Sequence, residues 1–128
     1  MSSSEPTKIG TLIVDDQTDL RLLLRMIIER NDDLFVTGEA ASGLEAIEHV
    51  ANEQPRVIIL DMMMPGMNGV ETATAIRAER PDQVIILCTA YLDADVIERA
   101  LAAGIVECVG KNQLWSLPQL IRDVAGAA

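Results

Sequence analysis

The chain has 128 residues, which is enough for one hydrophobic core and too few for two. Hydrophobic residues make up 49% of the chain and aromatic residues only 2%, so aliphatic side chains must fill the interior. The formal net charge of −10 argues against binding to nucleic-acid phosphates and to anionic membrane surfaces.

The hydrophobic residues are spread over many short runs. No stretch approaches the roughly 20 apolar residues that cross a bilayer, and the first ten residues contain no apolar run. We therefore expect a cytoplasmic protein. Cys88 and Cys108 lie inside apolar segments without the CxxC or Cys/His spacing of a zinc site. We expect two reduced, buried thiols.

Residues 1–8 are polar and are predicted to form a disordered leader before one domain at 9–128. Beyond them, short apolar runs alternate with segments of helical period. The predicted strands lie at 12–14, 34–36, 57–60, 84–88 and 105–109. The third and fourth runs are apolar without alternation, which indicates strands covered on both faces, as in a parallel sheet.

Helical segments between the runs carry apolar stripes and start signals. Apolar residues recur with helical spacing at 20–28 and again at 117–124. Ser42, Asn68 and Asp93 are candidate N-caps, and the first two stand three residues before a glutamate. Pro55 and Pro81 mark the ends of the second and third helices. The pattern predicts an α/β fold: a flavodoxin-like (βα)5 doubly wound parallel sheet with strand order 2-1-3-4-5.

Polar residues follow four of the predicted strands. Asp15 and Asp16 follow the first, Asp61 the third, Thr89 the fourth and Lys111 the fifth. Ligands bind at the carboxyl ends of the strands in such sheets, near the point where the strand order reverses. We expect these five side chains to converge at one edge.

Three carboxylates at one edge repel each other unless a cation joins them. Mg²⁺ suits oxygen ligands and keeps several waters. We expect Asp16 and Asp61 to bind the ion directly, the backbone carbonyl of Met63 to supply a third oxygen, and Asp15 to act through a water molecule. No role is expected for the Met63 side chain.

A carboxylate beside Mg²⁺ can attack phosphorus, because the metal and a nearby ammonium offset the charge that develops on the transferred oxygens. Asp61 is the predicted nucleophile and Lys111 the ammonium. The Thr89 hydroxyl can hydrogen-bond a phosphoryl oxygen, and its movement would shift the loop after the fourth strand.

Four motifs together resemble those of response-regulator receiver domains. They are V-D-D at 14–16, D-M-M-M-P-G-M-N-G at 61–69, C-T-A at 88–90 and the lysine at 111. The resemblance covers residues 9–125. It implies Mg²⁺-dependent phosphoryl transfer to Asp61 from a histidine kinase or a histidine phosphotransfer protein, and slow self-hydrolysis. It also implies signalling, including homodimerisation, through the face formed by the fourth helix, fifth strand and fifth helix.

The last helix resembles that of receivers that precede a LuxR-type helix-turn-helix domain. The chain is therefore either a fragment of a transcription regulator or a stand-alone receiver. Trp115, near this helix, is expected on the partner face. His49 has no motif that places it at the active edge, and we expect a surface residue.

Two departures from the family pattern stand out. Relatives usually carry Tyr or Phe three residues before the lysine, where this chain has Cys108, and many carry proline after the lysine, where it has Asn112. A thiol cannot swing as an aromatic ring does. We expect Tyr91 to substitute sterically, and no cis-proline in that loop.

Three functions remain as alternatives. The first is a binding switch whose catalysis is confined to its own phosphorylation and dephosphorylation. The second is a relay carrier that passes the phosphoryl group to another histidine. The third is an aspartate-nucleophile phosphatase. Such phosphatases carry a D-x-D motif after the strand, whereas this chain has Met63 in place of the second acid.

Overall fold

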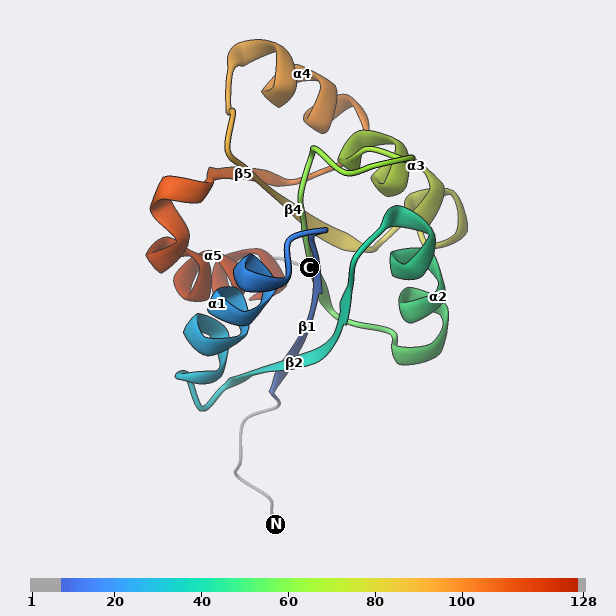
Figure 1. Cartoon of the computed structure of the whole chain (residues 1–128). Coiled ribbons are helices and arrows are strands. Elements are labelled where there is room, and N and C mark those ends of the chain that lie inside the picture. The colour runs from blue at the N-terminus through green and yellow to red at the C-terminus, as the bar shows by residue number, and fades with distance from the viewer. Residues whose placement is uncertain (1–7, 127–128) are drawn as a thin grey trace.

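The computed structural model describes residues 8–126, so the predicted leader lies outside the described residues except for Lys8. Five strands alternate with five helices along the chain (Figure 1). The strands are β1 Ile9–Val14, β2 Leu34–Ala40, β3 Val57–Leu60, β4 Val84–Thr89 and β5 Glu107–Gly110. The helices are α1 Thr18–Glu29, α2 Gly43–Glu53, α3 Gly69–Glu79, α4 Ala94–Ala102 and α5 Leu117–Gly126, with a short 3₁₀ helix, η1, at Lys111–Ser116.

All strand pairs are parallel, and the order is β2-β1-β3-β4-β5. The predicted fold class and strand order are confirmed. Helices α1 and α5 lie on one face of the sheet, and α2, α3 and α4 on the other (Figure 1). The three central strands are therefore buried on both faces, which explains their continuous apolar runs.

The predicted N-caps form in three helices. The Ser42 hydroxyl accepts a hydrogen bond from the Glu45 backbone at 3.2 Å, and the Asp93 carboxylate caps α4. At α3, Asn68 and Glu71 form a reciprocal capping box, with hydrogen bonds of 2.8 and 2.9 Å. These caps fix where α2, α3 and α4 begin, and thus where the preceding loops end.

The fifth strand begins two residues later than predicted. Gly104 has a φ of +89°, and the Ile105 backbone N–H donates to the Ala100 carbonyl at the end of α4. Ile105 is apolar because it is buried in the core below α4, not because it belongs to the strand.

One expectation about burial is wrong. Cys88 is buried as expected, but Cys108 is half-buried because β5 is an edge strand. Cys108 pairs in register with Leu87, so the two thiols lie on opposite faces of the sheet. His49, expected at the surface, is partly exposed, and its Nδ1 lies 2.6 Å from Glu53 Oε2. Among residues 8–126, no helix is long and apolar enough to span a membrane.

Candidate functional site

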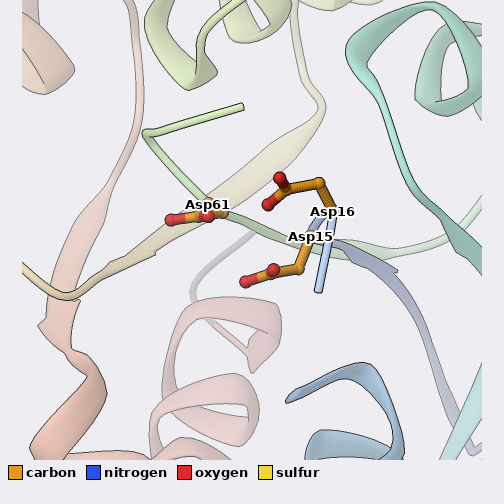
Figure 2. Close-up of side chains that lie close together, drawn as sticks. All are labelled: Asp15, Asp16 and Asp61. Atoms are coloured by element: carbon orange, nitrogen blue, oxygen red, sulfur yellow. The ribbon is translucent and has the colours of Figure 1, made fainter. Parts of the chain in front are cut away.

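The carboxyl ends of four adjacent strands bring the predicted site residues together. Asp15 and Asp61 follow β1 and β3, which pair through Val14 and Leu60. Thr89 ends β4, and Lys111 follows β5 directly. Figure 2 shows the carboxylates of Asp15, Asp16 and Asp61 grouped at this edge. One oxygen from each lies within 4.8 Å of the others.

Lys111 is the cation that contacts two of these carboxylates. Its Nζ lies 3.0 Å from Asp15 Oδ2 and 3.3 Å from Asp61 Oδ2. Burial lowers the pKa of the Lys111 ammonium, but the hydrogen bond to Asp15 and the negative charges of Asp61 and Asp15 outweigh it, so the net pKa is raised. Lys111 therefore stays protonated at neutral pH, but one ammonium faces three carboxylates.

The Asp61 carboxylate is buried, and its charge is poorly compensated. It is 4% exposed, and burial together with the charge of Asp15 raises the pKa of its carboxyl from 3.8 to about 6, although Lys111 and the Met63 backbone lower it. Its Oδ1 is shielded from solvent and has no hydrogen-bond partner within residues 8–126. A buried carboxylate oxygen without a donor is costly, and a bound cation would relieve that cost.

Both carboxylate oxygens of Asp15 and its backbone carbonyl oxygen accept hydrogen bonds from other residues of the protein. Oδ1 accepts from the Gln17 backbone N–H at 2.8 Å, and Oδ2 accepts from Lys111. The Asp15 carbonyl accepts from Nη1 of Arg21 at 2.6 Å. Sequence reasoning missed Gln17 and Arg21. The available signal for Arg21 was a cation close to the N-terminus of a helix, where the helix dipole disfavours positive charge.

Asp16 and Met63 lie on the two loops beside these buried acids. The Asp16 carboxylate is exposed, and it comes within the cluster of acidic oxygens. The Met63 side chain is 65% exposed and points away from the core. Its backbone lies close enough to the Asp61 carboxylate to lower the pKa of Asp61. The use of its carbonyl as a ligand stays a prediction.

Gly69, the last residue of the motif at 61–69, lets α3 approach the end of β3. Its backbone N–H donates to the Met62 carbonyl at 2.9 Å. A Cβ at this position would lie 2.5 Å from the Asp61 carbonyl oxygen and 2.9 Å from the Met62 Cα. Both neighbours are backbone atoms, so only glycine fits here without a shift of the loop that carries Asp61.

Thr89 ends β4, and residues after it line an open cleft together with Lys111. Thr89 is 1% exposed, and its hydroxyl accepts a long hydrogen bond of 3.5 Å from the Tyr91 backbone. The Tyr91 ring is 78% exposed. The cleft, of about 620 Å³, is lined by Ala90, Leu92, Gly110, Lys111, Asn112 and Gln113. Lys111 thus forms part of the wall of this cleft.

Comparisons with known proteins agree with this geometry. The family model described as "Response regulator receiver domain" matches residues 11–123. The sporulation initiation phosphotransferase F of Bacillus subtilis is 37% identical over 93 residues, which are 73% of each chain. Protein-glutamate methylesterase/protein-glutamine glutaminase 3 of Hahella chejuensis is 38% identical over 118 residues, or 91% of this chain. The match is 34% of that relative, so this chain spans about a third of its length.

Solved structures give the same result for the fold. The signal receiver domain of the putative response regulator NarL from Mycobacterium tuberculosis superposes with a TM-score of 0.90 and 26% identity, over 96% of this chain and all of that one. The response regulator domain of Thermotoga maritima CheB superposes with a TM-score of 0.85 and 27% identity, over 93% of this chain and 97% of that one.

Proposed function

This chain belongs to the response regulator receiver domain family, and we propose that it is a switch phosphorylated on Asp61. The domain covers residues 9–128. The observation that carries the proposal is the state of Asp61: a buried carboxylate with a raised pKa, an unpartnered oxygen, and the ammonium of Lys111 beside it. A buried carboxylate whose pKa is perturbed by burial and by a specific charged neighbour is typical of a functional site.

The donor set fits Mg²⁺. Three carboxylates face one ammonium, which leaves excess negative charge, and all ligand atoms are oxygens. Asp16 and Asp61 would bind the ion directly with the Met63 carbonyl, while Asp15, whose oxygens are already occupied, would act through water. When bound, Mg²⁺ would neutralise charge on the phosphoryl oxygens.

The residues of the chain have distinct roles in the transfer. A carboxylate oxygen of Asp61 forms the new O–P bond while the P–N bond of the donor phosphohistidine breaks, and the imidazole keeps the electron pair. Lys111, already 3.3 Å from Asp61, stabilises the charge on the transferred oxygens. Thr89 would exchange its long contact with the Tyr91 backbone for a phosphoryl oxygen, which shifts the loop after β4.

The partner would be a histidine kinase or a histidine phosphotransfer protein in the cytoplasm. The output would pass through the face formed by α4, β5 and α5, where it changes partner binding or dimerisation. Helix α4 exposes the large apolar side chains of Ile97 and Leu101, and Val106 before β5 and Trp115 before α5 are exposed as well. Because Cys108 is only half-buried and Tyr91 is exposed beside Thr89, we propose that Tyr91 supplies the bulk that an aromatic ring supplies in relatives.

A second candidate function is that of a relay carrier. The 37% identity to a protein named as a sporulation initiation phosphotransferase favours this alternative, because that relative matches over most of its own length. Transfer from phosphorylated Asp61 to a histidine phosphotransfer protein distinguishes a carrier from a switch that only changes partners. The phosphatase alternative is less well supported, because Met63 supplies no second acid after β3.

Beryllofluoride, a phosphoryl mimic, tests the proposal by two-dimensional NMR. Beryllofluoride added to the Mg²⁺-bound chain is expected to shift the backbone amides of Asp61, Thr89 and Lys111 beyond their positions with Mg²⁺ alone, and beryllofluoride without Mg²⁺ is not. Asp61→Asn should abolish the shifts. Asp82→Asn, which changes an exposed carboxylate in the turn before β4, should leave them intact. Equal shifts in the Asp61→Asn variant would contradict the proposal.

A further inference from the structure

Arg21 connects the acidic loop of the site to the edge strand of the sheet. Its Nη1 donates to the Asp15 carbonyl oxygen at 2.6 Å, and its Nε donates to Glu39 Oε1 on β2 at 3.1 Å. Arg25, one turn further along α1, donates to the other oxygen of Glu39 at 2.8 Å. The Arg21 side chain is only 15% exposed. Its guanidinium is therefore held between two fixed acceptors.

The position of Arg21 is electrostatically unfavourable. It is the fourth residue of α1, close to the positive end of the helix dipole, and it shares Asp15 as a hydrogen-bond acceptor with the second cation, Lys111. Glu39 compensates this charge by accepting from both arginines. The contact with the Asp15 carbonyl is the interaction by which Arg21 touches the site.

The Asp15 carbonyl belongs to the peptide group that leads to Asp16. The Asp15 backbone N–H donates to the Ala40 carbonyl at 3.0 Å, and Gln17 N–H donates to Asp15 Oδ1 at 2.8 Å. The second bond closes a turn around the 15–16 peptide group, and neither bond engages the carbonyl oxygen of that group. The hydrogen bond from Arg21 is the one that holds this carbonyl oxygen, directly before Asp16.

We propose that Arg21 is a positioning residue for the divalent cation: its hydrogen bond to the Asp15 carbonyl holds Asp16 in the orientation that binds Mg²⁺. The inference rests on the proposed function, because it takes Asp16 as a ligand. Arg21 itself touches neither the ion nor the phosphoryl group. A ligand held in place by a neighbouring hydrogen bond binds a metal without first losing conformational freedom.

The direction in which Mg²⁺ affinity changes when Arg21 is removed distinguishes a positioning role from a purely electrostatic one. If Arg21 acted only through its positive charge, its removal would make the site more negative, and Mg²⁺ would bind more tightly. If it positions Asp16, its removal weakens binding although the site becomes more negative. Isothermal titration of the full 128-residue chain with MgCl₂ at pH 7.5 measures the Kd directly, without phosphorylation.

The matched variants are Arg21→Ala, Arg21→Lys and Arg25→Ala. We expect Arg21→Ala to raise the Kd for Mg²⁺ roughly tenfold, as loss of a hydrogen-bond support behind a metal ligand does elsewhere. Arg21→Lys keeps the charge but lacks the fork that reaches the Asp15 carbonyl and Glu39 together, so it should also weaken binding. Arg25→Ala removes a partner of the same Glu39 without touching Asp15, and its Kd should stay within about twofold of wild type.

Thermal unfolding without Mg²⁺ shows that each variant is folded. An unchanged or lower Kd in folded Arg21→Ala would overturn the inference, and so would an equal loss in Arg25→Ala, which would point to a general effect on α1 and β2. Neither result would affect the role of Asp61. A wild-type chain that binds no Mg²⁺ would overturn the proposed function, and the inference with it.

Discussion

Replacing Asp61 by asparagine is expected to raise the free energy of unfolding in a buffer that contains EDTA and no Mg²⁺. Asparagine has nearly the same shape as the protonated carboxyl group and carries no charge. At neutral pH the wild-type carboxylate is ionised in a buried position, beside Asp15 and only partly balanced by Lys111. The substitution removes this unfavourable charge.

The magnitude follows from the pKa of Asp61. Its rise from 3.8 to about 6 on folding means that the ionised form is destabilised in the folded state. At about 1.4 kcal/mol per pKa unit, this corresponds to about 3 kcal/mol at pH 7. Because the folded-state pKa is raised, the penalty is fully present above pH 6, decreases as the pH falls, and disappears below 3.8. At pH 5 it should be about half as large.

Urea unfolding followed by circular dichroism measures the difference in the free energy of unfolding between Asp61→Asn and wild type at pH 7 and at pH 5. We expect Asp61→Asn to be about 2–3 kcal/mol more stable than wild type at pH 7, with a smaller difference at pH 5. Saturating Mg²⁺ should narrow the difference at pH 7, because the ion stabilises the folded wild-type chain. A folded Asp61→Asn variant that is no more stable than wild type at pH 7 in EDTA would refute the reasoning.

Three further predictions concern the same region. Asn68→Ala removes the capping box of α3 and should lower the free energy of unfolding by about 1 kcal/mol in urea, whereas an unchanged midpoint would show that the cap contributes nothing. Gly69→Ala places a Cβ against the Asp61 carbonyl and should cost about 1–3 kcal/mol; wild-type stability and unshifted Asp61 amide resonances would contradict the close contact. Binding of Mg²⁺ with beryllofluoride should weaken by about tenfold between pH 7.5 and pH 5, because Asp61 takes up a proton near pH 6, and a flat titration profile would disprove this.

Much of the fold could be predicted from the sequence, because its signals are local. The central strands are buried on both faces and are therefore continuously apolar. The caps at Ser42, Asn68 and Asp93 need only a side chain and a backbone N–H three residues apart. Parallel strands place the residues that follow them at one edge, so the convergence of Asp15, Asp61 and Lys111 followed from the strand order.

What the sequence could not predict depends on packing between distant elements. The burial of Cys108 depends on how much α4 covers the edge strand. The contact of Arg21 with Glu39 joins residues 18 positions apart, and no periodic pattern marks it. The pKa of Asp61 likewise follows from its depth in the structure rather than from its neighbours in sequence.

Intact-mass measurement after incubation with acetyl phosphate tests the central claim most directly. We expect the wild-type chain to gain the mass of one phosphoryl group, the gain to require Mg²⁺, and Asp61→Asn to show none. A gain that persists in Asp61→Asn, or a wild-type chain that is never modified when Mg²⁺ is present, would contradict the assignment of Asp61 as the phosphoacceptor.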